Sequence, residues 1–354
     1  MQNQTSLKSF ELPVPSIYNP DTVGEFFTPD YNRIMAAASE WRNHHNILPR
    51  RKDKHTVGFA VIDLQRTFCL KNGELTLEPA SVEDSKRICE FTYRNTRIIS
   101  NLMATLDTHF MFQIFHPPFW LDGNGSYVAP LTVIETKDIL SGKYRVNPEM
   151  AYAILGNMQY LGWLQEYVIE YTRKLAEQGK PPLVVWPVHG LFGSPGHSLV
   201  PAFQTACQMH ELARYARTNY RLKGDKPLSE HYSPFGTEVV EVTVHNNQMT
   251  VGELSDRVVD DLLKNIILIL AGEASSHCVG SGIYDVLKRI KAQDPNLAKK
   301  VYILKDCTSP VPGFEAQADK AFDEFENAGM HLVDSTTPMD EWPDVPDEVF
   351  KQVA

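Results

Sequence analysis

The chain has 354 residues, of which 43% are hydrophobic and 22% charged, so it has the composition of a globular protein with a large core. Its formal net charge of -10, without a cluster of Lys and Arg, argues against nucleic acid as a partner. Residues 1–20 are polar and interrupted by proline, unlike a secretory signal, and no segment approaches the ~18 apolar residues of a membrane span. The five cysteines lack the spacing of a disulfide framework. We therefore expect a cytoplasmic protein that does not bind membranes.

Short apolar runs alternate with longer helical patterns along the chain. Strand-like or β-branched segments lie at 56–62, 110–115, 183–186, 237–244, 266–270, 301–304 and 330–333. Helical patterns lie at 83–104, 159–178, 199–214, 255–264, 279–291 and 314–329. Such alternation favours right-handed crossovers between parallel strands. The predicted fold class is α/β, with three α/β/α layers around a central, mainly parallel sheet.

Potentially reactive side chains follow several of the expected strands. They are Asp63, His189, Cys278 and Asp306. The carboxyl ends of parallel strands meet at one edge of a sheet, and ligands of α/β proteins bind outside that edge. We therefore expect these side chains to converge on one site.

Cys278 lies where the strand 266–270 is followed by the polar turn 271–277 and then by the helix 279–291. A thiol at the N-terminus of a helix is biased toward the thiolate, its nucleophilic form. Taken alone, a free cysteine is more often a small buried hydrophobe. The position nevertheless makes Cys278 a candidate nucleophile.

A second set of residues suggests a metal site. Asp107 and His109 lie two residues apart, so an extended segment places both side chains on one side, and His189 comes from another strand end. One carboxylate and two imidazoles suit Zn²⁺, Fe²⁺ or Mn²⁺. His116 could be a fourth ligand or an ordinary loop histidine.

Each of these motifs is weak evidence alone, but five separated motifs in one order indicate a family specifically. They are Val61-Ile62-Asp63-Leu64-Gln65-Arg66-Thr67-Phe68-Cys69, Asp107-Thr108-His109, Val185-Trp186-Pro187-Val188-His189, Lys223-Gly224 with Glu230 to Phe235, and Gly272 to Cys278. In this order they resemble the successive motifs of the nicotinamidases, among the isochorismatase-like cysteine hydrolases. The resemblance runs from about residue 55 to about residue 335 and implies the isochorismatase-like hydrolase fold.

The resemblance implies a catalytic triad of Asp63, Lys223 and Cys278. The implied reaction converts nicotinamide to nicotinate and ammonia through a thioester on Cys278, with Asp63 as base and then acid. Lys223 would favour the thiolate. The backbone N–H groups of Ala274 and Cys278 would form an oxyanion hole, aimed by a cis peptide between Glu273 and Ala274. Without the resemblance, Asp63 could equally be a turn cap and Lys223 a solvated loop lysine.

The resemblance also gives roles to the metal and to aromatic residues. One divalent ion on Asp107, His109 and His189 would hold the pyridine nitrogen of the substrate. Phe68 and Trp186 match the aromatic walls that enclose this ring. Tyr232 could be a third wall or ordinary core packing. The implied partner is a small-molecule amide.

The chain departs from the family in length. We expect residues 1–54 to form an N-terminal extension that packs on the core, residues 55–340 the hydrolase domain, and residues 341–354 a C-terminal tail. An insertion at about 113–158 is rich in Pro, Gly and aromatic residues, which fits an ordered loop over the site or an oligomer contact. A homo-oligomer is expected.

Three alternatives stay open on this sequence. A related hydrolase could act on another small amide, such as an N-carbamoyl or ureido compound, which has less use for the metal. A vinyl-ether hydrolase would not need the Cys278 thiol. The chain could also be a catalytically silent ligand-binding or scaffold protein, which would be free to lose Asp63, Lys223 and Cys278.

Overall fold

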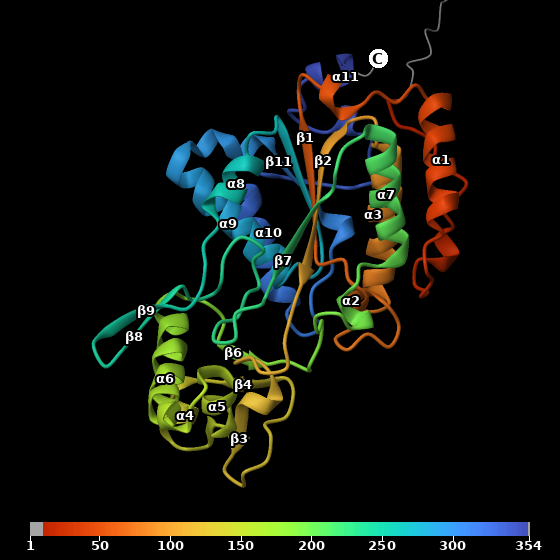
Figure 1. Ribbon diagram of the computed structural model, residues 1–354. Helices are drawn as coiled ribbons and strands as arrows, with labels where there is room; N and C mark the ends of the chain where they lie inside the picture. The colour runs from red at the N-terminus through yellow and green to blue at the C-terminus, as the bar shows by residue number, and fades with distance from the viewer. Residues whose placement is uncertain (1–9, 353–354) are drawn as a thin grey trace, which may run out of the picture.

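The computed structural model describes residues 10–352, and its centre is a six-stranded parallel sheet (Figure 1). Its strands are β1 (Val57–Ile62), β2 (Ile99–Asp107), β7 (Asn219–Lys223), β10 (Ile267–Gly272), β11 (Val301–Leu304) and β12 (His331–Val333). The order is β12-β11-β10-β1-β2-β7, and all neighbours are parallel. The chain runs outward from β1 to β7, then from β10 to β12 on the other side. The order therefore reverses between β1 and β10, which is where α/β sheets bind ligands.

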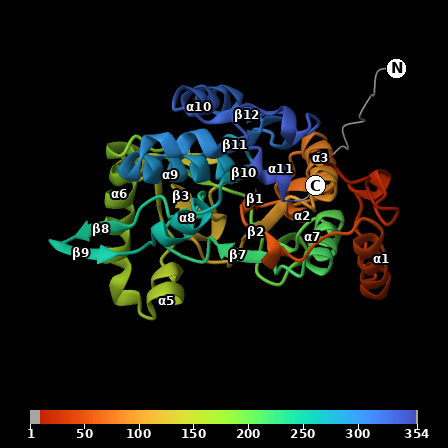
Figure 2. The same cartoon turned by 90° about the horizontal axis from the view of Figure 1, so that it is seen from above.

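Helices cover both faces of the sheet, so the predicted three-layer α/β fold is confirmed (Figures 1 and 2). One face carries α1 (Tyr31–His44), α3 (Ala80–Arg94) and α7 (Pro201–Arg214). The other carries α8 (Asp256–Leu262), α9 (Cys278–Gln293) and α10 (Glu315–Asn327). In β1, Phe59 and Val61 pack into the first layer, whereas Ala60 and Ile62 pack into the second. This alternation, with both faces buried, explains why the strand is a continuous apolar run.

The predicted helix 83–104 is wrong in its second half. Helix α3 ends at Arg94, where the Asn95 side chain donates to the Phe91 carbonyl at 3.1 Å, and β2 then takes residues Ile99–Asp107. A strand buried on both faces has no polar alternation, so its apolar residues could be mistaken for a continued helix. The strand predicted at 110–115 is absent from the described residues, because β2 already ends at Asp107.

Two further segments were assigned incorrectly. The strand predicted at 183–186 exists as β6 (Leu183–Val185), but it pairs antiparallel with β4 (Thr132–Ile134) and lies outside the main sheet. The segment 237–244 contributes only β8 (Glu241–Val244), which forms a hairpin with β9 (Asn247–Thr250). Strand β7 was not predicted. It is an edge strand of the sequence Asn-Tyr-Arg-Leu-Lys and is mostly exposed before Lys223.

Residues 113–158 form a small structure of their own below the carboxyl edge of the sheet (Figure 1). Its elements are β3 (Trp120–Asp122), β4, α4 (Thr136–Leu140), β5 (Tyr144–Val146) and α5 (Glu149–Leu155). With α6 (Leu161–Glu177) and β6 they enclose a separate apolar core. Tyr167 of α6 donates from its hydroxyl to the Leu228 carbonyl at 2.5 Å, which ties this core to the loop after β7.

The terminal segments contact the sheet domain. Helix α1 packs along α7, and the Trp41 ring lies 6.2 Å from the Tyr93 ring of α3. At the other end, the Gln352 side chain accepts from the Lys54 and His55 amides at 3.0 and 3.1 Å. Residues 1–9 and 353–354, assigned above to the extension and the tail, lie outside the described residues. Between residues 10 and 352, no helix is long and apolar enough to cross a membrane.

Trp41→Ala should lower the free energy of unfolding by about 3–5 kcal/mol, because it leaves a cavity between α1 and α7. The side chain of Trp41 is only 7% exposed. Denaturant unfolding would measure the loss, and Tyr31→Ala on the same helix, at a position 54% exposed, should change little. A Trp41→Ala protein as stable as the wild type would show that the extension is not part of the cooperative core.

Candidate active site

Four side chains meet at the point where the strand order reverses. Asp63 follows β1, Asp107 ends β2, Lys223 ends the edge strand β7, and Cys278 opens α9 after β10. Asp107 and Lys223 are paired directly across their strands. The expected convergence is therefore present for Asp63 and Cys278, which meet Asp107 and Lys223, and all four residues are buried.

Asp306 does not join them. Its carboxylate accepts two hydrogen bonds from Ser335, one from the amide and one from the hydroxyl, both at 2.8 Å. It therefore holds the turn after β11 to the segment after β12. The expectation that Asp306 contributes to the site is wrong, because its carboxylate is bonded to Ser335 and does not line the pocket.

Lys223 is the centre of the cluster. Its Nζ lies 2.9 Å from Asp63 Oδ2 and 2.9 Å from Asp107 Oδ1. It also donates to the His231 carbonyl at 2.9 Å and lies 3.5 Å from the Cys278 sulfur. The side chain is fully buried, so the interpretation of a solvated loop lysine is wrong.

Asp63 has a backbone φ of 48°, in the left-handed region, which turns the chain sharply at the end of β1. Its amide donates to Thr105 Oγ1 at 3.0 Å, and the Thr105 hydroxyl donates back to Asp63 Oδ1 at 2.6 Å. The second carboxylate oxygen is thereby left to face Lys223. Thr105 lies inside β2, and no sequence motif identified it.

Burial and the Lys223 charge act in opposite directions on the pKa values of Cys278 and Asp63. Burial raises the pKa of the Cys278 thiol well above its usual range, although the Lys223 charge acts in the opposite direction. Burial also raises the pKa of Asp63, again against the Lys223 charge. Burial disfavours the Asp107 anion too, but His109 and Lys223 outweigh it and hold that carboxyl pKa well below its usual range. The bias toward the thiolate expected from the helix N-terminus is thus opposed by desolvation of the sulfur anion, and the nearby ammonium favours the anion.

The turn before Cys278 contains the expected cis peptide between Glu273 and Ala274, which is confirmed. The Ala274 carbonyl accepts from the amides of His277 and Val279 at 3.0 and 3.1 Å, so it faces the first turn of α9. Ala274 and Cys278 both line the pocket. The role of their N–H groups as an oxyanion hole stays a prediction.

Asp107, His109 and His189 bring one ligand atom each within 4.8 Å of one another, as a metal site requires. His109 Nε2 lies 3.2 Å and His189 Nε2 3.9 Å from Asp107 Oδ2. The Nδ1 atoms are bonded elsewhere, to the carbonyls of Gly224 at 3.0 Å and Pro187 at 2.7 Å. Each ring therefore carries a proton on Nδ1 and turns its Nε2 toward the carboxylate. This donor set fits a divalent transition-metal ion.

Two neighbours bear on this metal-ligating set. His116 is buried, and its ring centroid lies 5.7 Å from that of His109 and 5.8 Å from that of His189. Its Nδ1 contacts the Phe110 carbonyl at 3.0 Å, while its Nε2 has no partner among residues 10–352. Gln65 fixes the backbone of Asp107, accepting from its amide at 2.6 Å and donating to its carbonyl at 2.9 Å.

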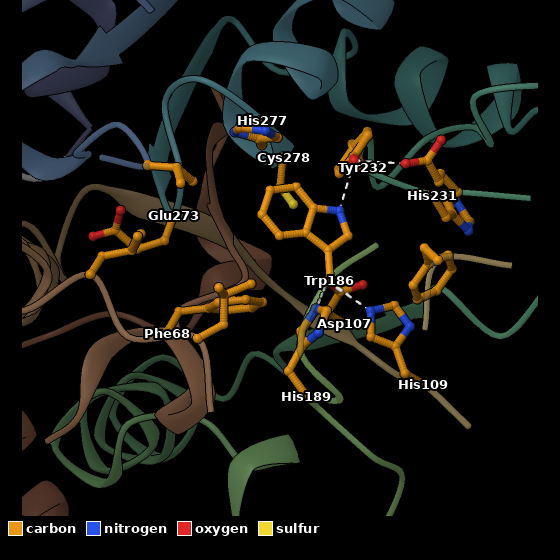
Figure 3. A pocket seen from close by; sticks show the side chains of 16 residues that line it. Phe68, Asp107, His109, Trp186, His189, His231, Tyr232, Glu273, His277 and Cys278 are labelled. Atoms are coloured by element: carbon orange, nitrogen blue, oxygen red, sulfur yellow. Dashed lines mark hydrogen bonds and ion pairs between the residues drawn. The ribbon is translucent and has the colours of Figure 1, made fainter. Parts of the chain in front are cut away.

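One pocket is lined both by Cys278 and by Asp107, His109 and His189 (Figure 3). Phe68, Trp186 and Tyr232 all line it, together with His277, whose ring lies 5.3 Å from each of Trp186 and Tyr232. The segment after β7 adds two lining residues whose roles were not predicted, Glu230 and His231. They lie within the Glu230–Phe235 motif, so their position was signalled by the sequence, but their contacts were not.

Glu230 is a buried carboxyl group of the pocket wall. Burial raises its pKa to about 8, although the hydrogen bond from Tyr232 acts in the opposite direction. The Tyr232 hydroxyl donates to Glu230 Oε1 at 2.9 Å, and the Tyr171 hydroxyl donates to Oε2 at 3.3 Å. The group is therefore mainly neutral at pH 7.

Comparison with known proteins gives fold similarity at low sequence identity. No protein-family model matches the sequence, and no curated protein matches it significantly. The yeast nicotinamidase Pnc1p bound to the inhibitor nicotinaldehyde is 18% identical, with a TM-score of 0.49 over 79% of this chain and 100% of that one. A nicotinamidase and pyrazinamidase of Acinetobacter baumanii is 15% identical, with a TM-score of 0.48 over 80% and 98%. The Pyrococcus horikoshii pyrazinamidase in complex with zinc is 16% identical, with a TM-score of 0.41 over 78% and 98%. These similarities are too low to assign an activity to this chain.

Glu230 should make stability depend on pH. Its pKa is about 8 in the folded chain and near 4.5 when exposed, so the folded state binds the extra proton between these values. The stabilisation is complete below about pH 4.5 and is lost as the pH rises through 8. The melting temperature of Glu230→Gln, measured between pH 5 and 8.5, should therefore rise by several degrees relative to the wild type as the pH increases. A difference that stays constant over this range would contradict the raised pKa.

Proposed function

We propose that the protein is an amidohydrolase that converts nicotinamide to nicotinate and ammonia through a thioester on Cys278. The observation that carries the proposal is the position of Lys223 Nζ, 2.9 Å from the carboxylates of Asp63 and Asp107 and 3.5 Å from the sulfur. This arrangement assembles a nucleophile, a base and a fixed positive charge in one buried site. The order of motifs that resembles the nicotinamidases supports the same assignment.

In the proposed acylation, the Cys278 sulfur bonds to the amide carbon while its proton moves to Asp63. The raised pKa of Asp63, caused by burial, suits a group that accepts this proton. Lys223 lowers the cost of the developing thiolate, because its charge opposes the effect of burial on the thiol. The N–H groups of Ala274 and Cys278 would hold the carbonyl oxygen as it becomes negative.

The C–N bond then breaks, and Asp63 returns the proton to the departing nitrogen, which leaves as ammonia. Water enters next, and Asp63 takes one of its protons as the hydroxyl oxygen bonds to the thioester carbon. The C–S bond breaks, nicotinate is released, and the proton on Asp63 restores the thiol. One amide and one water are consumed, and one acid and one ammonia are formed.

Asp107, His109 and His189 would hold one Zn, Fe or Mn ion. When bound, such an ion supplies a Lewis acid for the pyridine nitrogen of the substrate. Backbone carbonyls orient the rings of His109 and His189, because each ring donates its Nδ1 proton to one of them. Phe68, Trp186 and Tyr232 would enclose the substrate ring between aromatic faces.

We also propose that this activity serves NAD salvage in the cytoplasm and that the protein is a homo-oligomer. The five cysteines are free and buried, which is compatible with a reducing compartment. Phe110, Met111 and Phe112, beside the site, are 50%, 43% and 44% exposed, and such a cluster is a reasonable contact surface.

Cys278→Ala should reduce ammonia release from nicotinamide by at least about a thousandfold, because the covalent step is lost. The assay uses purified protein supplied with Zn²⁺, Fe²⁺ or Mn²⁺. Cys89→Ala, which changes a buried cysteine of α3 outside the pocket, is the matched control and should retain activity. Wild-type activity that survives Cys278→Ala would reject the thioester. A wild type active only on N-carbamoyl or ureido amides would change the substrate but keep the reaction class.

Removal of the metal by chelation should raise the KM for nicotinamide more than it lowers kcat, because the ion would serve mainly to hold the substrate ring. Added Zn²⁺, Fe²⁺ or Mn²⁺ should restore the KM. His189→Ala, which removes one ligand, should resemble the chelated protein and should respond weakly to added metal. Full activity with an unchanged KM after complete chelation would contradict a role of the ion in the reaction.

A further inference from the structure

Helix α6, which shares an apolar core with the insertion at 113–158, contacts the pocket wall through two tyrosines. Tyr167 and Tyr171 are both fully buried and face the segment after β7. The Tyr171 hydroxyl accepts from the Glu230 amide at 2.9 Å and donates to Glu230 Oε2 at 3.3 Å. The main chain and the side chain of Glu230 are thus held by one residue of that shared core.

Glu230 in turn holds the aromatic wall of the pocket. The indole N–H of Trp186 can only donate, and it donates to the Tyr232 hydroxyl at 2.9 Å. The Tyr232 hydroxyl must then give its own proton to another acceptor, which is Glu230 Oε1 at 2.9 Å. The Val184 amide, just before Trp186, donates to the same oxygen at 3.4 Å. Figure 3 shows the link from Trp186 to Tyr232 as a dashed line.

This chain of hydrogen bonds has a fixed direction, from Trp186 through Tyr232 to Glu230. It uses the polar atoms of both rings internally, so the rings can offer a ligand only their apolar faces and edges. Their planes stand 87° apart with centroids 6.4 Å apart, an edge-to-face arrangement that a rotation of either ring would lose. The orientation of the wall therefore depends on an acceptor at Glu230.

Other roles for Glu230 fit the contacts less well. Both of its oxygens are directed at Tyr171, Tyr232 and Val184, and it is not a member of the metal-ligating groups found among residues 10–352. No contact joins its carboxyl group to Cys278 in the described part of the chain. Glu230 therefore acts through Tyr232 and Trp186 and not on the reacting atoms.

We propose that Glu230 is a positioning residue, and that helix α6, through Tyr171 and Glu230, selects flat aromatic amides by fixing the Trp186 and Tyr232 rings. The substrate class in this inference rests on the proposed function. Helix α6 is then a specificity element of the pocket.

The kinetic test compares variants along the chain of hydrogen bonds. Glu230→Ala should raise the KM for nicotinamide by about tenfold and change kcat by less than about threefold, because the rings are loosened and the triad is untouched. Tyr171→Phe should raise the KM by a smaller factor. Glu230→Gln, which keeps an acceptor for Tyr232, should restore a KM within about threefold of the wild type. A purely structural role would lower the active fraction and hence kcat, with the KM unchanged, and that result would overturn the inference.

The matched control is Tyr302→Phe, which also removes a hydroxyl bonded to a backbone carbonyl, that of Pro343 at 2.7 Å, but lies outside the pocket. It should leave the KM unchanged. A KM that rises as much in Tyr302→Phe as in Glu230→Ala would show a general effect of destabilisation and would also overturn the inference.

A second readout does not need turnover. The indole N–H resonance of Trp186, assigned by its loss in Trp186→Phe, should shift in Tyr232→Phe and in Glu230→Ala but not in Tyr302→Phe. If the indole resonance does not shift in Glu230→Ala, the positioning role of Glu230 is refuted, while the amidase assignment is unaffected. Another outcome is that the wild type does not hydrolyse nicotinamide, yet nicotinamide still binds to Cys278→Ala and binds more weakly when Glu230→Ala is added. That result would refute the proposed function and leave the positioning role of Glu230 intact. If nicotinamide neither reacts nor binds, both proposals fall.

Discussion

One buried ammonium group, that of Lys223, holds the site together. Removal of an amine and two carboxylates from water costs several kcal/mol per ion, and the arrangement is tolerable only because each charge has close partners. Lys223 meets Asp63 and Asp107 at 2.9 Å each, and a backbone carbonyl at the same distance. These contacts require the ends of β1, β2 and β7 to lie together, which the parallel sheet provides. The Cys278 sulfur lies 3.5 Å from this ammonium group, which is also paired with the two carboxylates at the strand ends.

Asp107 connects the two halves of the site. One of its oxygens faces Lys223 and the other faces the imidazoles of His109 and His189. His109 and Lys223 hold the pKa of the Asp107 carboxyl well below its usual range, although burial acts in the opposite direction. Asp107 therefore stays an anion, with Lys223 on one side and the two imidazoles on the other. A bound metal ion and the nucleophile would therefore be coupled through a single carboxylate. In the proposed mechanism, Asp107 would therefore set the distance between the bound ring and the bond that is cleaved.

The sequence predicted the parallel sheet and the residues at its strand ends, because buried strands and polar residues after them leave local signals. The end of α3 was missed, since the apolar residues of β2 continue the pattern of a helix until Asn95 ends it. The edge strand β7 was missed because exposed residues lack an apolar pattern, although its last residue is Lys223. The effect of burial on the pKa of Cys278 could not be predicted, because burial is a property of the whole fold. Among the partners of Glu230, Tyr232 lies in a motif, but Tyr171 of α6 and Val184 of β6 lie in none.

The central claim is that Cys278 forms a covalent bond to the acyl group of an amide substrate. The most direct measurement is mass spectrometry of the protein quenched in acid during turnover of nicotinamide, followed by mapping of the modified peptide. The account predicts a nicotinoyl adduct on the peptide that contains Cys278, absent from Cys278→Ala. Steady turnover without an adduct at any time, or an adduct on another residue, would contradict it.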